Sequence, residues 1–234
     1  THVAQSQGEV DFIENQHGKG PAQYLAGLGV LDENSVAAHL TFASQGDLDA
    51  IRDVGAGYAH CSTIYPRRGV YPDIPSIDAR SIPWGLATDW MMNDPFEAMR
   101  NAMNALRMRQ KTFEAFSSQQ ALTRATTGSA TVLGLENDIG KLAPGFKADL
   151  IQIDIGQPHL TPFYAGYSSI AYYARAGDVV TSIIDGKPVM EDRQVLGIDE
   201  SKALAAANRH LPGWAAMMNK LGGTAHPGLC ACGC

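Results

Sequence analysis

The stretch Gly85-Leu86-Ala87-Thr88-Asp89 is the last of four short apolar runs that each end on a residue able to bind a metal or move a proton. The earlier three are Thr1-His2, Val36-Ala37-Ala38-His39 and Gly57-Tyr58-Ala59-His60. A stretch with helical spacing follows every run, and strands that alternate with helices form parallel sheets with right-handed crossovers. The carboxyl ends of such strands meet at one edge of a sheet or one mouth of a barrel. The four terminal residues are therefore expected to converge on one site.

The rest of the pattern divides the chain into an α/β part and a smaller β part. Buried strands are expected at 36–40, 56–61 and 84–88, and helices at 8–29, 47–54, 74–79 and from an Asp94-Pro95 cap onward. Later expectations are two short helices at 119–126 and 129–135, a turn-rich segment at 140–149, a hairpin of 179–184 with 188–190, and a last helix at about 200–221. The turn-rich segment is interpreted as structural, with Asp149 bonding to backbone.

Composition and charge narrow the classes of partner. The chain has 234 residues, of which 45% are hydrophobic, and a net charge of −6. No run approaches the roughly 18 uncharged apolar residues that cross a bilayer, and no secretory signal is recognised, so we expect a cytoplasmic protein. Lys and Arg do not cluster as they do in proteins that neutralise a phosphate backbone. We therefore expect neither a membrane nor a nucleic acid as partner.

The four Cys residues fall into two groups. Cys230, Cys232 and Cys234 lie in a Gly- and Pro-rich tail, where a spacing of one residue is too tight for a standard zinc knuckle. We expect this tail to be disordered and exposed to oxidants. Cys61 stands alone after His60, and we interpret it as a small buried packing residue rather than as a nucleophile.

Five pieces of the sequence, taken in order, carry a family resemblance. They are His2-Val3-Ala4-Gln5 followed by Glu9, Ala38-His39, Ala59-His60-Cys61, Ala87-Thr88-Asp89, and Gly140-Lys141-Leu142-Ala143-Pro144-Gly145 through Ala148-Asp149-Leu150. Each piece alone is a weak signal, but their order and spacing leave little room for accident. Together they resemble the amidohydrolase superfamily, in particular its cytosine-deaminase-like and triazine-hydrolase-like (chlorohydrolase) branch.

The resemblance implies a metal-dependent (β/α)8 TIM barrel with a β-sandwich to which both chain ends contribute. It places the four runs on barrel strands 5–8. The family's first-strand His-x-His pair does not occur in this sequence, and only four units precede residue 110, whereas a barrel of eight units needs roughly 200–250 residues. We therefore expect an α/β fold made of the second half of the barrel, with the N-terminal half of the same enzyme as a partner.

This expectation assigns four regions to the chain. Residues 1–135 would form the C-terminal half of the catalytic barrel, and 136–197 would form sandwich strands with a helix that returns to the barrel. Residues 198–222 would form a C-terminal helix and 223–234 a flexible Cys- and Gly-rich tail. Family enzymes are commonly homo-oligomers, and we expect the same here by analogy.

The resemblance also assigns roles to the residues that end the four runs. His2 and Asp89 would bind one divalent metal ion, zinc, with iron(II) left open because His and Asp serve both. His39 would orient the attacking water and Asp89 would take its proton, which makes these two the expected catalytic residues. His60 would lie near the substrate. A single His at a strand end is more often a core or rim residue than a ligand, so the expectation rests on the residues as a set.

The implied reaction is hydrolysis of a C–N bond in a small heterocyclic or aromatic amine by a metal-activated water. Gln5 departs from the family pattern, because deaminases of this branch usually carry Glu there and Gln cannot donate and regain a proton at neutral pH. Its amide can still hydrogen-bond a substrate. Hydrolysis of another leaving group, such as chloride or an alkylamine, stays open as the alternative. Glu9 is expected to face solvent rather than to replace the missing acid.

Two loops offer further candidates for binding the small-molecule substrate. Trp90, followed by Met91 and Met92, is expected to form an apolar wall against a ring, with core packing as the alternative. Arg67, beside Arg68, is expected to bind a substrate carboxylate or carbonyl, although at least one of the two should be a solvated surface charge. A rival from another class is a non-catalytic half-barrel that binds a ligand or needs a partner chain.

Overall fold

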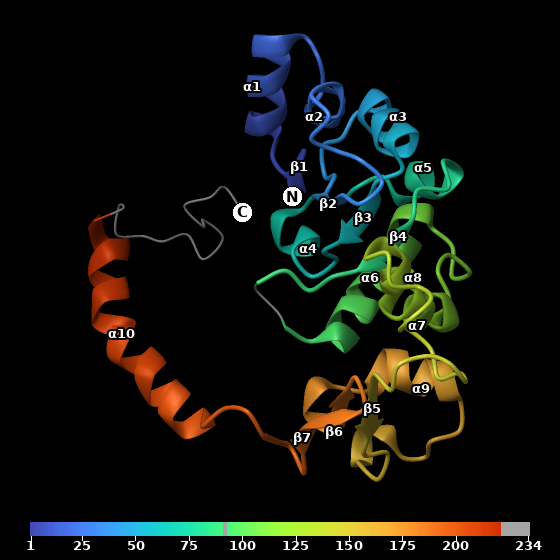
Figure 1. Cartoon of the computed structure of the whole chain (residues 1–234), viewed down its shortest axis with the longest axis vertical. Helices are drawn as coiled ribbons and strands as arrows, with labels where there is room; N and C mark the ends of the chain where they lie inside the picture. The colour runs from blue at the N-terminus through green and yellow to red at the C-terminus, as the bar shows by residue number, and fades with distance from the viewer. Residues whose placement is uncertain (91–92, 221–234) are drawn as a thin grey trace.

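The computed structural model describes residues 1–90 and 93–220, and it begins with a parallel sheet. Its strands are β1 (His2–Val3), β2 (Val36–His39), β3 (Gly57–His60) and β4 (Trp84–Leu86), hydrogen-bonded in that order and all parallel. The strands predicted from the four apolar runs are thus confirmed. They lie side by side in the upper half of the molecule as drawn in Figure 1.

Helices connect these strands and cover the sheet. Between β1 and β2 lie α1 (Gln7–His17) and α2 (Pro21–Gly27), between β2 and β3 lies α3 (Gln45–Val54), and between β3 and β4 lie α4 (Tyr65–Arg68) and α5 (Ile74–Ala79). After β4 come α6 (Pro95–Gln110), α7 (Ser118–Ala125) and α8 (Thr127–Val132). The alternation predicted from the sequence is confirmed, whereas the short helix α4 falls where only a loop was expected.

A second, antiparallel sheet follows. It contains β5 (Leu150–Ile153), β6 (Val179–Ile184), β7 (Lys187–Glu191) and β8 (Gln194–Val195) in that order, and β6 and β7 form the predicted hairpin. Between β5 and β6 lie the 3₁₀ turns Pro158–Leu160 and Ala176–Asp178 and the helix α9 (Gly166–Tyr173). The expected backbone role of Asp149 is confirmed, because its Oδ1 accepts a hydrogen bond from the Asp185 amide at 2.6 Å.

The last described element is α10 (Glu200–Lys220), which extends away from both sheets (Figure 1). The predicted C-terminal helix is therefore present. The prediction of a flexible tail at 223–234, with its three Cys residues, lies outside the described residues.

Capping residues in the sequence explain where the main helices begin. Asp94 precedes Pro95, and its Oδ1 accepts hydrogen bonds from the amides of Phe96 and Glu97 at 2.8 and 3.3 Å, as the sequence predicts for the start of α6. At α3, Ser44 and Asp47 form a reciprocal capping box. The left-handed glycine Gly55 ends this helix, with φ of 75°.

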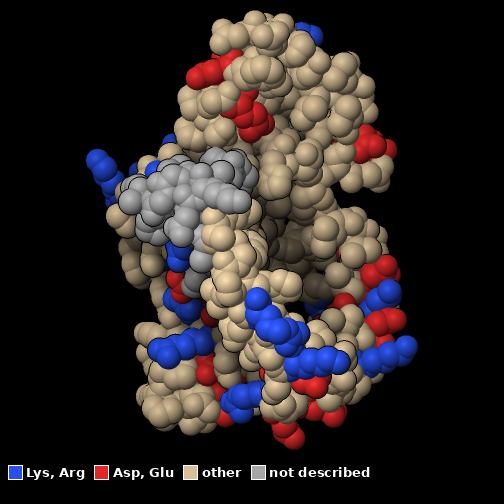
Figure 2. Space-filling view, turned by 90° about the vertical axis from the view of Figure 1, so that its left-hand side faces the viewer, with Lys and Arg blue, Asp and Glu red and all other residues tan. Residues whose placement is uncertain are grey.

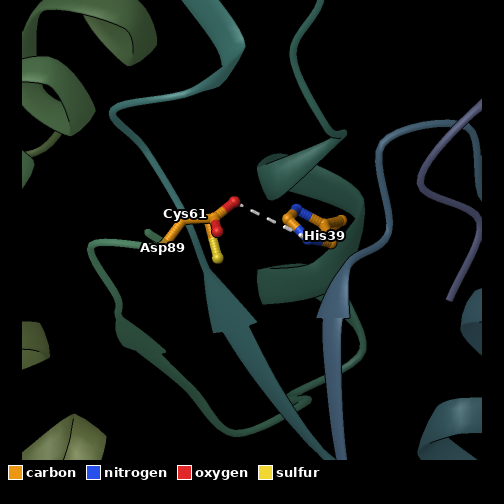
Figure 3. Close-up of side chains that lie close together, drawn as sticks. All are labelled: His39, Cys61 and Asp89. Atoms are coloured by element: carbon orange, nitrogen blue, oxygen red, sulfur yellow. Dashed lines mark ion pairs between the residues drawn. The ribbon is translucent and has the colours of Figure 1, made fainter. Parts of the chain in front are cut away.

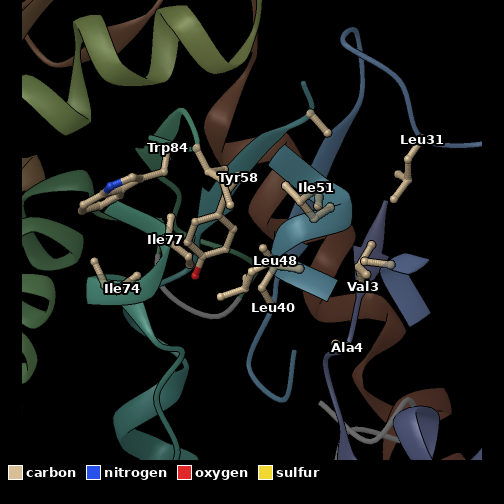
Figure 4. Packing of buried hydrophobic residues seen from close by; sticks show 14 of the residues in the cluster. Val3, Ala4, Leu31, Leu40, Leu48, Ile51, Tyr58, Ile74, Ile77 and Trp84 are labelled. Carbon is tan, nitrogen blue, oxygen red and sulfur yellow. The ribbon is translucent and has the colours of Figure 1, made fainter. Parts of the chain in front are cut away.

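Two larger apolar cores, beside a small cluster of Cys61, Ile64 and Tyr65, hold the described part of the fold together. The larger core packs the parallel sheet against α1, α2, α3 and α5, and Figure 4 shows its central members, among them Val3, Leu48, Ile51, Tyr58 and Trp84. The smaller core joins α6 to α7 and to the segment around α9 through Phe96, Met99, Met103, Ala121 and Ala171. The sheet is therefore fixed from its helical side, which leaves the carboxyl ends of the strands free to carry polar groups.

The exposed surface is mixed in charge. On the face drawn in Figure 2, Lys and Arg are interspersed with Asp and Glu over the lower half, and few charged residues occur over the upper half. In the part of the chain that the structure describes, no helix combines the length and the apolar character needed to span a bilayer.

Asp47 joins two helices through a buried carboxylate. Its Oδ1 accepts hydrogen bonds from the amides of Ala22 and Gln23 at the start of α2, at 2.8 and 3.2 Å. Its Oδ2 accepts from the amide and hydroxyl of Ser44, at 3.0 and 2.7 Å. A Cβ on Gly20 would lie 2.3 Å from both carboxylate oxygens, so only glycine fits beside them. The carboxylate thus satisfies helix-terminal amides that water cannot reach.

We expect Asp47→Ala to lower the free energy of unfolding by about 2–4 kcal/mol, because it leaves several buried donors without an acceptor and removes a helix cap. Urea titration followed by circular dichroism measures this difference. Asp53→Ala in the same helix is the matched control, because that side chain is 64% exposed, and it should change stability by less than about 1 kcal/mol. Equal losses for the two variants would contradict the assigned role.

Candidate functional site

His39 occupies an unusual backbone conformation at the end of β2. Its φ is 78° and that of the next residue, Leu40, is 46°, both in the left-handed region that costs a residue with a Cβ about 1–3 kcal/mol. The carbonyl of His39 accepts hydrogen bonds from the hydroxyls of Tyr58 and Tyr65, at 3.0 and 3.1 Å. Both tyrosines are almost completely buried. These two bonds hold the strained turn and so fix the direction of the His39 ring.

His60 belongs to the same buried hydrogen-bond network. Its Nδ1 lies 2.8 Å from the Tyr58 hydroxyl and its Nε2 lies 2.8 Å from the Tyr71 hydroxyl. Because the Tyr58 hydroxyl donates to His39, it must accept from His60 Nδ1–H, and His60 Nε2 then accepts from Tyr71. Burial, with a smaller contribution from His39, lowers the pKa of His60 to about 3, so the ring is neutral. One tautomer satisfies every bond in the chain.

Asp89 approaches His39 from the loop after β4. Its Oδ2 lies 3.9 Å from His39 Nε2, and its side chain is 11% exposed. Its Oδ1 accepts a hydrogen bond from the Trp90 amide at 2.6 Å, whereas its Oδ2 is buried and has no hydrogen-bond partner. The Thr63 hydroxyl donates to the carbonyl of Thr88 at 2.9 Å, which ties this loop to the end of β3. The backbone therefore fixes one carboxylate oxygen, whereas the other has no hydrogen-bond partner.

The imidazole of His39 is neutral. Burial lowers its pKa to about 4, against the opposing effect of the Asp89 carboxylate, and electrostatic interactions with His2 and Arg68 lower it further. Its Nδ1 is a second buried atom without a hydrogen-bond partner. Buried polar atoms without partners are uncommon in folded proteins and call for an explanation such as a bound ion. A neutral ring can bind a metal or accept a proton.

Cys61 completes a compact group. One ligand atom each from His39, Cys61 and Asp89 lies within 4.8 Å of the other two, beyond the ends of β2 and β3 (Figure 3). Cys61 is buried against Ile64 and Tyr65, which confirms the packing interpretation. Burial, together with the charge of Asp89, raises the pKa of its thiol to about 12, so it is a poor nucleophile at neutral pH. The packing interpretation missed that its sulfur faces the two candidate catalytic residues.

The start of the chain adds His2 and Gln5 to the same edge. The His2 ring is exposed and stacks on the His39 ring, with centroids 5.1 Å apart and an interplanar angle of 11°. Gln5 is half-buried. Glu9 was expected to face solvent, but its carboxylate instead accepts hydrogen bonds from the amides of Ala4 and Gln5, at 2.8 and 2.9 Å. Glu9 therefore fixes the backbone that carries His2 and Gln5.

The remaining predicted residues lie outside this group. His60 has no exposed surface and both its ring nitrogens are bonded to tyrosine. Arg67 is exposed, and Trp90 is 60% exposed at the rim. Met91 and Met92 lie outside the described residues. The substrate-binding residue predicted from the sequence is Arg67, but Arg68 is the one that is half-buried, has a buried Nη2 without a hydrogen-bond partner and lowers the pKa of His39.

Comparisons with known proteins place the chain in a family. Residues 1–189 match the amidohydrolase family, and the chain belongs to it. This confirms the resemblance drawn from the sequence.

Relatives of known name are about twice as long as this chain. It is 37% identical over 214 residues to a 5-methylthioadenosine/S-adenosylhomocysteine deaminase of Pelotomaculum thermopropionicum. This match covers 89% of this chain and 49% of that protein. It is 31% identical to a 5'-deoxyadenosine deaminase of Methanosarcina mazei, with coverage of 89% and 49%. The chain therefore spans about half the length of the curated relatives that it matches.

Solved structures show the same fold. An adenosine deaminase from Xanthomonas campestris with bound zinc superposes with a TM-score of 0.80 at 23% identity, over 89% of this chain and 48% of that one. The atrazine chlorohydrolase of Arthrobacter aurescens, complexed with zinc, superposes with a TM-score of 0.77 at 19% identity, over 89% and 47%. The fold is thus that of amidohydrolases of the TIM-barrel type.

We expect Tyr71→Phe to lower the free energy of unfolding by about 1–3 kcal/mol, because it leaves the buried Nε2 of His60 without a donor. Urea unfolding at pH 7 measures the change. Tyr164→Phe is the matched control, because that side chain is 83% exposed, and its effect should stay within about 0.5 kcal/mol. If Tyr71→Phe unfolds at the same urea concentration as the parent, the proposed hydrogen-bond chain through His60 is incorrect.

Proposed function

We propose that this chain is the C-terminal half of a metal-dependent deaminase that hydrolyses the exocyclic C–N bond of an adenosine-like compound. The observation that carries the proposal is the convergence of His39 and Asp89, 3.9 Å apart, beside the stacked ring of His2. The three residues end different segments of a parallel α/β unit, where barrel enzymes carry their catalytic groups.

The residues fit a divalent metal ion. Asp89 Oδ2 is a buried acceptor atom without a hydrogen-bond partner, and carboxylate and imidazole are donors that zinc accepts. His2 and Asp89 are the proposed protein ligands from this chain. A zinc ion held there would lower the pKa of a water molecule from 15.7 towards about 7. Zinc is favoured because it is named with the similar adenosine deaminase and chlorohydrolase structures.

In the proposed reaction, Asp89 transfers protons and His39 orients the attacking water. Asp89 takes the proton of the attacking water and returns it to the leaving nitrogen, so that ammonia departs as a neutral molecule. The neutral ring of His39 accepts a hydrogen bond from that water and aims its lone pair at the substrate carbon. His60 acts through Tyr58 on the carbonyl of His39, and we assign it a positioning role.

The substrate assignment follows from the relatives and from the groups around the site. The named relatives are deaminases of adenosine derivatives. The Gln5 amide is proposed to hydrogen-bond a ring nitrogen, and Trp90 to cover an apolar part of the ligand. Arg68, more than the exposed Arg67, is proposed to contact an electronegative substrate group, because its buried Nη2 has no protein partner.

The missing half of the site is proposed to come from outside this chain. Four parallel strands in sequential order are half of an eight-stranded barrel, and the chain spans about half of its relatives. We infer that the remaining strands, with a first-strand His pair, complete the barrel, and that the antiparallel sheet β5–β8 is one part of a β-sandwich. A homo-oligomer and a cytoplasmic location stay predictions.

In the complete polypeptide that carries this chain, we expect Asp89→Asn to lower kcat/KM for 5'-methylthioadenosine by about 10²–10⁴-fold, because an amide cannot relay the proton. Ammonia release measures the rate. Asp53→Asn, on the exposed face of α3, is the control and should retain full activity. Turnover at the parent rate by Asp89→Asn would reject the mechanism.

A second candidate reaction is hydrolytic removal of chloride or an alkylamine from a similar ring, which Gln5 favours because these groups need less help from an acid. We expect Gln5→Glu to raise ammonia release from an amino-substituted ring relative to chloride release from the matching chloro-substituted ring by about 10²-fold. Gln16→Glu on the exposed side of α1 is the control. An unchanged ratio would show that Gln5 does not select the leaving group.

A further inference from the structure

A groove separate from the site described above lies between the end of α4 and the helix α6, both labelled in Figure 1. Its volume is about 590 Å³, which falls in the range of pockets that hold small ligands, about 300–1,000 Å³. Its walls include Val70 and Tyr71 on one side and Asn101, Ala105, Met108 and Arg109 of α6 on the other. The groove therefore offers a second place for a small molecule to bind.

The chemistry of the groove favours an apolar ligand with one negative charge. Val70, Ala105 and Met108 supply apolar surface. Arg109 is the only charged residue among the described residues that line the groove. It is exposed, and its Nη1 donates a long hydrogen bond of 3.4 Å to the carbonyl of Tyr71. A guanidinium has five N–H donors in a planar fork, so donors remain for a carboxylate, whose geometry matches the fork.

Tyr71 connects the groove to the buried interior. It forms part of the wall, and its hydroxyl lies 2.8 Å from His60 Nε2. Burial raises the pKa of this hydroxyl, with a smaller opposing effect from Arg109, so the hydroxyl stays protonated at neutral pH and donates to His60. A ligand that pairs with Arg109 and contacts the Tyr71 ring would therefore displace the hydroxyl that satisfies His60.

Two further hydrogen bonds extend this connection to His39. His60 Nδ1 lies 2.8 Å from the Tyr58 hydroxyl, which donates to the carbonyl of His39 at 3.0 Å. His60 and Tyr58 have no exposed surface, so neither ring can move far without losing a bond. Energetic coupling between distant sites is carried by contiguous packed and hydrogen-bonded groups of this kind. The groove and the strained turn at His39 are thus joined by one chain of contacts.

We propose that this groove binds a small apolar carboxylate through Arg109, and that binding changes the hydrogen bond between Tyr71 and His60. The carboxylate pairs with the guanidinium, and the apolar part of the ligand packs on Val70 and Met108. The proposal goes beyond the proposed deaminase function, because it requires neither a bound metal nor turnover.

Phenylacetate and phenylacetamide are the matched probes, because they share an apolar part and differ in the negative charge. Binding is measured by NMR titration of the complete polypeptide that carries this chain. We expect phenylacetate to bind about 10-fold more tightly than the amide, because a charge-assisted pair with Arg109 is stronger than a hydrogen bond between neutral groups. Equal affinity for the two probes overturns the proposal.

Two variants locate the probe in the groove. Arg109→Gln should bind the two probes equally, whereas Arg209→Gln, at an exposed position of α10, is the matched control and should keep the preference. Ala105→Trp fills the groove and should weaken phenylacetate binding by about 10-fold. Circular dichroism shows that each variant is folded. A preference for phenylacetate that survives Arg109→Gln assigns the probe to another site and overturns the proposal.

The coupling has its own readout in the ring nitrogens of His60. In protein with isotope-labelled histidine, saturating phenylacetate should shift the Nε2 resonance of His60. Tyr71→Phe keeps the aromatic wall but lacks the hydroxyl, so it should bind the probe without this shift. An unchanged His60 resonance in the saturated parent, or a shift that persists in Tyr71→Phe, overturns the coupling. Ammonia release and Asp89→Asn test the deaminase proposal separately, so the two failures are distinguishable.

Discussion

Parallel pairing of four consecutive strands is the constraint on which the site depends. The register sets His2 opposite Ala38 and Val3 opposite His39, and it aligns Ala38 with Ala59 and His60 with Leu86. Residues far apart in the chain therefore reach the same edge of the sheet at nearly the same height. The loop after β4 needs only a few more residues to bring Asp89 to the ring of His39.

The fold stabilises a site that is locally unfavourable. His39, Leu40 and Asp89 have positive φ, and two buried polar atoms lack partners. Two kinds of contact offset these unfavourable contributions to folding. They are the hydrogen bonds from Tyr58 and Tyr65 to the carbonyl of His39, and the apolar core beneath the sheet. Strain and unsatisfied polar atoms cluster at functional sites because the surrounding structure holds them there.

The chain belongs to the amidohydrolase family and spans about half the length of the curated relatives that it matches. Asp89 and His39 lie at the carboxyl ends of the parallel strands, and His2 is exposed on β1, which is an edge strand of the described sheet. A barrel closes by pairing its first and last strands, so edge strands such as β1 and β4 are where further strands would add. The exposure of His2 agrees with this edge position of β1.

Local signals in the sequence predict the order of strands and helices, the cap at Asp94, and the set His2, His39 and Asp89, because periodicity, capping residues and strand-end residues can be recognised without the fold. The sequence placed a helix between 136 and 197 without locating it, since Gly, Ser and Tyr in α9 are poor helix formers that fold there by packing on α6 and α7. Three features depend on tertiary contacts instead: Arg68 rather than Arg67 approaches His39, Glu9 binds backbone amides, and Cys61 faces Asp89. Side-chain direction at a strand end or in a single helical turn depends on contacts with distant segments, which no local pattern records.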